Sequence, residues 1–119
     1  VNETIAGMVY RYEWRDGGVI GGRRDFGNVI APDAPEGIKG PDGMKFGADG
    51  RLYVTVFAQG DVTILDADGQ VSERIRTIGA FPTNLAFGLP GDKRIYVTED
   101  EHGTLEVYDV GVDGFNLYD

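Results

Sequence analysis

Short runs of apolar and β-branched residues alternate with polar residues along the whole chain, and turns rich in glycine and aspartate separate them. The clearest example is Met44–Phe46, then an Asp49-Gly50 turn, then Leu52–Thr55. An Asp-Gly pair between two such runs is a strong short-range signal for a β-hairpin. Nineteen glycines in 119 residues are too many for a helical protein. The pattern therefore predicts an all-β fold made of many short strands.

One pattern of strands occurs three times along the chain. Residues 1–12, 54–65 and 97–108 align by residue type, with offsets of 53 and then 43 residues. A period of this size made only of short strands is typical of a β-propeller, in which each blade is a four-stranded antiparallel sheet. The longer first interval contains Ile30–Gly40, whose mixture of proline, glycine and charge indicates an inserted loop.

The three repeats predict about two and a half blades. We expect a half blade at residues 1–40 and full blades at residues 41–81 and 82–119, so that the chain starts inside a blade. The predicted strands are Gly7–Glu13 and Val19–Phe26, then Gly43–Phe46, Arg51–Val56, Asp61–Asp66 and Gln70–Ile75, then Asn84–Phe87, Arg94–Thr98, Thr104–Asp109 and Phe115–Tyr118. Two and a half blades cannot close a ring and would leave strand edges unpaired. We therefore expect upstream residues or another chain to complete it.

Composition and charge narrow the classes of function. The net charge is −9 and the isoelectric point is about 4.4, which argues against nucleic-acid and anionic-membrane partners because both would be repelled. The chain has no cysteine, so thiol catalysis and thiolate metal sites are excluded. Neither an apolar run of about 18 residues nor a basic-then-apolar leader is visible, so no transmembrane segment or signal peptide is expected. The localisation stays unknown.

Asp42 is the acid at the mouth of the predicted hairpin, and it is the main candidate for chemistry. Pro41 fixes φ before it and Gly43 frees the backbone after it, so its carboxylate can be aimed along the strand entrance. The acidic composition of the chain is compatible with cation binding. The alternative is a turn-forming aspartate whose side chain hydrogen-bonds the backbone two residues on.

Thr83 and Asn84 occupy the corresponding position in the next repeat, because Pro82 aligns with Pro41. They are candidates for substrate binding or for support of the site, and the alternative is that they cap the strand turn.

Two further groups of side chains have expected positions. Tyr53, Phe87 and Tyr96 recur at equivalent blade positions and are expected in the core between sheets. Phe57 and Gln59, and in the next repeat Asp100 to His102, fall in matching loops between the second and third strands. Loops there can line the pocket, but surface exposure without a role is expected.

Four segments together carry a family resemblance. These are Pro41-Asp42-Gly43-Met44, Asp49–Val54, Phe81–Gly88 and Arg94–Thr98. In this order, they resemble the motifs of the SMP-30/gluconolactonase family. The resemblance extends over nearly the whole chain and corresponds to the C-terminal part of that family's six-bladed propeller.

The resemblance implies a lactone hydrolase, usually acting on a small sugar lactone, with one divalent metal at the top of the central channel. Ca²⁺ is the expected ion, with Zn²⁺, Mn²⁺ or Mg²⁺ as alternatives. By this resemblance Asp42 is a metal ligand and a proposed general base. The family's other protein ligands, a glutamate from the first blade and asparagines from middle blades, lie upstream of the present residues. Such an ion polarises the lactone carbonyl, and a neighbouring carboxylate takes a proton from the attacking water.

The sequence is compatible with three functions. The first is metal-dependent hydrolysis of a sugar lactone, with the site completed by another chain, such as a second copy in a homo-oligomer, or by an N-terminal part. The second is a non-catalytic propeller piece used for binding or assembly. The third is another propeller enzyme, similar to strictosidine synthase or an arylesterase, because fold alone does not decide function. A metal near Asp42 distinguishes the first from the second.

Overall fold

The computed structural model describes residues 1–116 as ten strands, with no helix among them. The strands are β1 (Asn2–Glu3), β2 (Met8–Arg15), β3 (Gly18–Asn28), β4 (Gly40–Phe46), β5 (Leu52–Phe57), β6 (Asp61–Leu65), β7 (Val71–Arg76), β8 (Pro82–Phe87), β9 (Arg94–Glu99) and β10 (Thr104–Asp109). Every strand pairs antiparallel with its neighbours. The expected all-β fold is confirmed.

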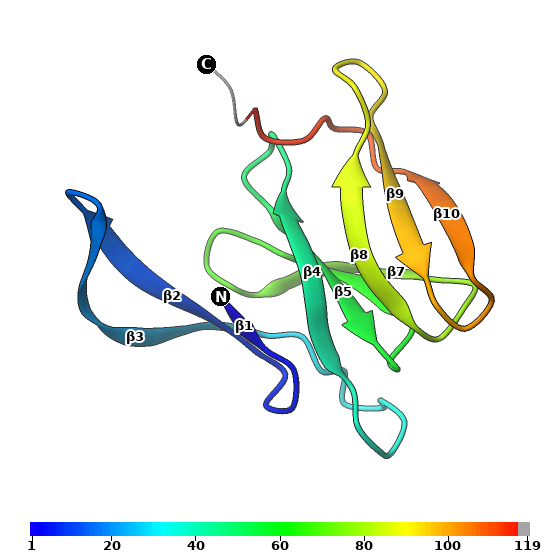
Figure 1. The fold of residues 1–119 in the computed structure, drawn as a ribbon, viewed down its shortest axis with the longest axis horizontal. Helices are drawn as coiled ribbons and strands as arrows, with labels where there is room; N and C mark the ends of the chain where they lie inside the picture. The colour runs from blue at the N-terminus through cyan, green and yellow to red at the C-terminus, as the bar shows by residue number, and fades with distance from the viewer. Residues whose placement is uncertain (117–119) are drawn as a thin grey trace.

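The strands form three sheets that fan out from a shared inner edge (Figure 1). The first sheet has the order β1-β2-β3, the second β4-β5-β6-β7 and the third β10-β9-β8. The second sheet is thus the four-stranded antiparallel unit of a propeller blade. Strands β2, β6 and β10 begin at Met8, Asp61 and Thr104, which reproduces the offsets of 53 and 43 residues seen in the sequence.

The segment after β10 differs from the expected fourth strand of the third sheet. Gly114 forms an isolated bridge with Gly47, and the N–H of Phe115 donates to the Phe46 carbonyl at 2.9 Å. Phe115 therefore contacts the end of the β4–β5 hairpin in the second sheet instead of pairing with β10. Tyr118, the expected end of that strand, lies outside the described residues.

The core consists of two apolar clusters, one on each side of the second sheet. The cluster toward the first sheet contains Val9, Val29, Leu52, Val54, Val56 and Leu65; the one toward the third contains Tyr53, Val62, Ile64, Leu85, Ile95 and Val97. Successive β5 residues enter opposite clusters because side chains alternate across a strand. Full burial of such a side chain contributes about 1.5–3 kcal/mol, so the second sheet is stabilised from both faces.

Tyr53, Phe87 and Tyr96 are predicted to lie in the core, and Tyr53 alone of these three is fully buried. Tyr53 is completely buried, and the half-buried Phe87 packs against it edge-on with ring centroids 5.0 Å apart. Tyr96 is also half-buried, because its hydroxyl reaches outward to donate to Asp92 Oδ2 at 2.6 Å. Tyr96 therefore lies at the edge of the core.

The expectation that Gln59 is exposed is wrong. Its side chain is buried, and its Nε2 donates to the Val29 carbonyl at 3.0 Å and to Asp61 Oδ2 at 2.8 Å. Its Oε1 accepts the N–H of Ala31 at 2.9 Å. Gln59 thus joins the first and second sheets through an amide that satisfies buried polar groups. The half-buried Phe57 stacks on the Phe81 ring, with centroids 4.8 Å apart.

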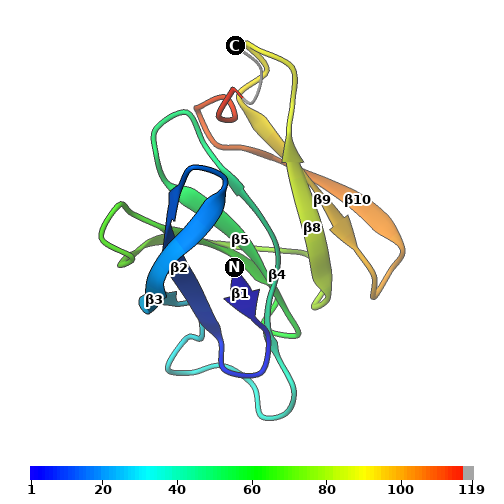
Figure 2. The same cartoon turned by 60° about the vertical axis from the view of Figure 1, so that its left-hand side comes forward.

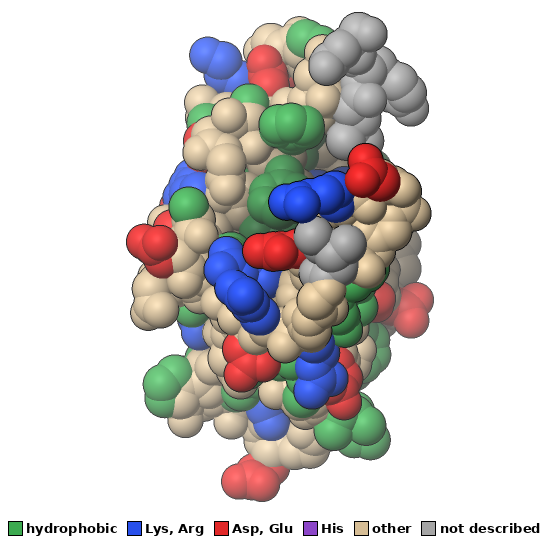
Figure 3. Space-filling view, turned by 90° about the vertical axis from the view of Figure 1, so that its left-hand side faces the viewer, with side chains coloured by type: hydrophobic (Ala, Val, Ile, Leu, Met, Phe, Trp, Pro, Cys, Tyr) green, Lys and Arg blue, Asp and Glu red, His purple; other side chains and the backbone are tan. Residues whose placement is uncertain are grey.

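The side of the molecule with β2 and β3 carries interspersed basic and acidic side chains (Figure 3). The acidic excess of the chain therefore does not form a single-sign field on this face. Within residues 1–116 there is no helix long and apolar enough to cross a membrane.

Candidate functional site

The candidate residues lie on the inner strands of neighbouring sheets. Asp42 is on β4, and Thr83 and Asn84 are on β8. Figures 1 and 2 show β4 running between β1 and β8, and the three strands contact one another in that order. The structure thus brings the three predicted residues to one inner edge.

A β-bulge interrupts β4 at the candidate site. Pro41 pairs with Val56 and Met44 pairs with Val54, so two residues of β4, Asp42 and Gly43, lie opposite one residue of β5. Bulges redirect side chains and are frequent beside active sites. The bulge supplies a local reason for Asp42 to leave the regular alternation of the strand.

A second bulge occurs at the matching position of β8. Pro82 pairs with Glu99 and Asn84 pairs with Thr98, which leaves Thr83 as the additional residue. The Pro-Asp-Gly and Pro-Thr-Asn segments therefore have the same irregularity in adjacent sheets. The alignment of Pro41 with Pro82 thus corresponds to a real structural equivalence.

The Asp42 side chain is exposed, and no residue within 1–116 makes a hydrogen bond or ion pair with its carboxylate. The hydrogen bond to the backbone two residues on, which a turn-forming aspartate would make, is not found among these residues. Its backbone carbonyl, in contrast, accepts the side-chain amide of Asn2 at 2.7 Å. The backbone of Asp42 is held while its carboxylate oxygens face solvent.

Thr83 and Asn84 are more engaged than Asp42. Thr83 Oγ1 lies 2.8 Å from Thr98 Oγ1, and Asn84 Oδ1 accepts the N–H of Leu85 at 2.9 Å. The first is a contact between β8 and β9, and the second is a local bond to the next residue of β8. The side chain of Asn84 also lies against Gly43, where an added Cβ would come within 2.1 Å of Asn84 Oδ1. Asn84 is therefore next to the bulge that carries Asp42.

The sequence reasoning missed the side chains that hold the two bulges. Asn2 donates to the Asp42 carbonyl, and Thr55 Oγ1 lies 3.0 Å from the Gly43 carbonyl and 3.1 Å from the Thr83 carbonyl. The signal was present, because the repeat alignment places Asn2, Thr55 and Thr98 at equivalent positions with offsets of 53 and 43. A polar residue is most conspicuous at Thr55, because β5 is otherwise apolar and is buried on both faces.

The donor set fits a divalent metal only in part. Asp42 offers a hard carboxylate oxygen, but residues 1–116 contain no group of three His, Cys, Asp or Glu side chains that could hold a metal. Calcium takes six to eight oxygen ligands. Among the residues that the structure describes, Asp42 offers a carboxylate that could serve as one ligand, and no cluster of such side chains completes a centre around it.

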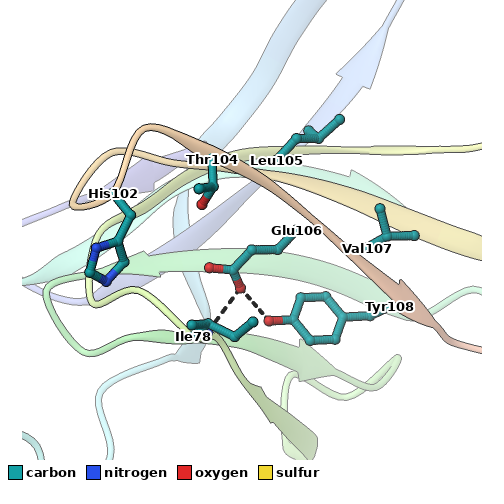
Figure 4. A pocket seen from close by; sticks show the side chains of 7 residues that line it. All are labelled: Ile78, His102, Thr104, Leu105, Glu106, Val107 and Tyr108. Carbon is teal, nitrogen blue, oxygen red and sulfur yellow. Dashed lines mark hydrogen bonds between the residues drawn. The ribbon is translucent and has the colours of Figure 1, made fainter.

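Two cavities lie away from Asp42, Thr83 and Asn84. One, of about 600 Å³, is between the β2–β3 hairpin and the second sheet, next to the exposed Trp14. The other, of about 590 Å³, lies beside β10 (Figure 4) and is lined by Ile78, His102, Thr104, Leu105, Glu106, Val107 and Tyr108. Its exposed Leu105 and Val107 are the repeat equivalents of Val62 and Ile64, which are buried against the third sheet. The β10 cavity therefore occupies the position in the third sheet that matches the packed face of the second sheet.

The carboxylate in the β10 cavity is already engaged. Glu106 accepts the N–H of Ile78 at 2.9 Å and the hydroxyl of Tyr108 (Figure 4). It also accepts the N–H of Gly79 at 3.0 Å. Burial acts to raise the pKa of Glu106, but these donors outweigh it and lower the pKa below the ordinary value. Burial and the bond to Glu106 raise the pKa of Tyr108 to about 12. Glu106 holds the loop before β8 and is not free for a ligand.

Glu99, at the end of β9, is a second buried structural carboxylate. It accepts three backbone N–H groups, from Phe81 at 3.1 Å, Glu101 at 2.6 Å and His102 at 2.9 Å. Burial acts to raise the pKa of Glu99, but the three donors lower it below the ordinary value. Unlike the carboxylates of Glu99 and Glu106, the carboxylate of Asp42 remains available to a ligand.

The antiparallel sheets fanning from a common inner edge, with matching bulges on that edge, define a partial β-propeller. Residues 1–100 match the SMP-30/gluconolactonase/LRE-like region, and the chain belongs to this family. The chain is 35% identical over 97 residues to pentonolactonase XacC of Haloferax volcanii. The match covers 81% of this chain and 32% of that protein.

Two solved structures are similar in fold. A luciferin-regenerating enzyme has a TM-score of 0.71 and 21% sequence identity, and the match covers 94% of this chain and 40% of that one. Regucalcin of Agrobacterium tumefaciens, described as a calcium-binding protein, has a TM-score of 0.72 and 21% identity, covering 93% of this chain and 40% of that one. The chain spans about a third of the length of the pentonolactonase and two fifths of these structures.

Proposed function

We propose that this chain is part of a metal-dependent lactone hydrolase that acts on a small sugar lactone. The observation that carries the proposal is the Asp42 carboxylate, which is exposed, unpaired by residues 1–116 and set on a bulge between two other inner strands. Membership of the SMP-30/gluconolactonase/LRE-like family and the similarity to a pentonolactonase support the choice of substrate class.

In this proposal Asp42 has two tasks. It gives one oxygen ligand to a divalent ion, with Ca²⁺ expected first and Zn²⁺, Mn²⁺ or Mg²⁺ as alternatives. The similarity in fold to a calcium-binding protein agrees with that order. A bound ion supplies positive charge beside the lactone carbonyl. The remaining ligands come from outside residues 1–116, either from an upstream part of the protein or from another chain, such as a second copy.

Asp42 also acts as the general base. It takes a proton from a water whose oxygen bonds to the carbonyl carbon. The ring C–O bond then breaks, and the released ring oxygen takes up a proton to give a hydroxy acid. In the proposal, Thr83 and Asn84, on the neighbouring inner strand, contact the hydroxyl groups of the sugar lactone. No covalent intermediate with the protein is needed.

The test is to measure the solution mass by light scattering with and without calcium, and to assay hydrolysis of glucono- and pentonolactones on the same samples. An assembly larger than 12.9 kDa that hydrolyses a lactone supports completion of the site by separate chains, provided that Asp42→Asn abolishes the activity. Activity that persists in Asp42→Asn would contradict the proposed role of Asp42.

A binding or assembly module is the second candidate. It is favoured by the absence, within residues 1–116, of a three-residue metal cluster and by the position of both cavities away from Asp42. A chain that is inert toward lactones, and whose mass and stability ignore calcium, would support this second function over the first.

A further inference from the structure

Side chains hold the backbone of the Asp42 bulge, where the pairing of β4 with β5 is irregular. The bulge takes the Asp42 and Gly43 carbonyls out of the register between β4 and β5. Asn2 Nδ2 donates to the first at 2.7 Å, and Thr55 Oγ1 lies 3.0 Å from the second. Thr4 Oγ1 donates to the carbonyl of Pro41 at 2.9 Å. Three consecutive carbonyls are thus satisfied by side chains.

The bond from Asn2 comes from a different sheet. Asn2 lies on β1, where it pairs with Val9, and β1 is part of the first sheet. The backbone of Thr4, which follows β1, lies so close to β4 that a Cβ built at Gly40 would be 1.7 Å from the Thr4 carbonyl oxygen. The first sheet therefore contacts β4 directly before the bulge and is able to fix its geometry.

The same connection occurs at the next junction between sheets. Thr55, the repeat equivalent of Asn2, lies 3.1 Å from the carbonyl of Thr83, which is the additional residue of the β8 bulge. In both cases a polar side chain of one sheet lies within hydrogen-bond distance of a bulge carbonyl of the next sheet, and the single hydroxyl proton of Thr55 is shared between the Gly43 and Thr83 carbonyls. The first bulge has a carboxylate, on Asp42, whereas the additional residue of the second bulge is Thr83.

We infer that Asn2 is a positioning residue for Asp42, an inference that rests on the proposed role of Asp42 as a ligand and base. The Asp42 carbonyl and the Gly43 N–H belong to one planar peptide. The bond from Asn2 holds this plane, and with it the direction of the Cα–Cβ bond that aims the carboxylate. A site is effective only when its reacting groups are held in place by such supporting contacts.

The test uses three variants of the 119-residue chain. Asn2→Ala removes the donor. Asn2→Thr restores a donor of the type that Thr55 uses at the equivalent position. Asn28→Ala is the matched control, because Asn28 is an asparagine of the same sheet whose amide contacts the Ala6 carbonyl at 3.5 Å and makes no hydrogen bond to β4 within residues 1–116.

The first readout is the NMR order parameter of the Gly43 N–H, which does not depend on metal or activity. We expect a rigid value of about 0.85 in the unmodified chain, a fall below about 0.6 in Asn2→Ala, and a rigid value in Asn2→Thr and Asn28→Ala. The order parameter of the N–H of buried Tyr53 should be the same in all variants as in the unmodified chain. A rigid Gly43 N–H in Asn2→Ala, or a mobile one in the unmodified chain, would overturn the inference.

The second readout is a calcium titration, which separates this inference from the proposed function. Loss of a supporting contact behind a metal ligand costs about 10–100-fold in affinity, so Asn2→Ala should bind calcium at least about tenfold more weakly, with recovery in Asn2→Thr. If the unmodified chain binds no calcium, the proposed metal role fails, and the order parameter alone decides whether Asn2 positions Asp42. Equal calcium affinity in Asn2→Ala and the unmodified chain would overturn the inference.

Discussion

The side chain of Asn84 lies directly against the α-carbon of Gly43. A Cβ built at Gly43 would be 2.1 Å from Asn84 Oδ1 and 2.7 Å from Asn84 Cα. The second distance involves backbone, so the clash cannot be relieved by a side-chain rotation alone. The glycine after Asp42 therefore allows the inner strands β4 and β8 to approach each other at the candidate site.

Gly43→Ala should separate β4 from β8 and destabilise the protein. Overpacking of this kind costs about 1–3 kcal/mol, which denaturant unfolding would measure. Gly22→Ala on β3 is the control, because a Cβ there meets no atom within 4 Å. Equal unfolding midpoints for the two variants would show that the contact between Gly43 and Asn84 does not limit the approach of the strands.

Asp42→Asn should weaken calcium binding without affecting the fold. The change keeps the shape of the side chain and removes the charge that a divalent ion prefers. We expect a loss of about tenfold or more in affinity, equivalent to about 1.4 kcal/mol, by calorimetric titration. Asp68→Asn, at an exposed aspartate of the β6–β7 turn, should bind as the unmodified chain does. A loss in Asp68→Asn equal to that in Asp42→Asn would indicate only non-specific binding to an acidic surface.

Gln59→Leu should destabilise the junction of the first and second sheets. Burial already raises the pKa of Asp61, and the hydrogen bonds from Thr63 and Gln59 offset this only in part. Loss of the Gln59 amide leaves the carbonyl of Val29 and one oxygen of Asp61 without this donor, at a cost of about 1–3 kcal/mol. Thermal unfolding measures the effect. Gln70→Leu, at an exposed glutamine, should change stability little, and a cost as large as that of Gln59→Leu would argue against a specific role of the buried amide.

Stability should fall in acid as Glu99 becomes protonated. Its pKa in the folded protein is below the ordinary glutamate value of 4.5, so the unfolded chain takes up the proton first as pH decreases. The stabilisation is therefore fully present above pH 4.5 and is lost as pH falls through the lower folded pKa. Glu106, whose pKa is also lowered, acts in the same direction.

The measurement is the unfolding midpoint as a function of pH between neutrality and acid. Glu99→Gln should be less stable than the unmodified chain near pH 7, because its amide nitrogen cannot accept the N–H groups that the carboxylate accepts. Its stability should also depend less on pH below 4.5. A variant with an unchanged acid dependence would show that Glu99 does not contribute to it.

Much of the fold could be predicted from the sequence because blades are local units. The offsets of 53 and 43 residues reappear as the starts of β2, β6 and β10, and the Asp49-Gly50 pair forms the turn between β4 and β5. Each depends on neighbouring residues in the chain, on period-two alternation and on turn chemistry. Phe115 was misplaced, because whether its backbone pairs with β10 or with Phe46 depends on how two sheets meet.

The candidate site, like the fold, could be predicted from the sequence only in part. The sequence alone determined that Asp42, Thr83 and Asn84 follow equivalent prolines at the starts of equivalent strands. Only the tertiary structure decided that Gln59 is buried and that Asn2, 40 residues away in the sequence, holds the Asp42 carbonyl. Local patterns set the strands and bulges, whereas burial and hydrogen bonds between sheets arise only when one sheet packs on the next, and no short segment encodes that neighbour.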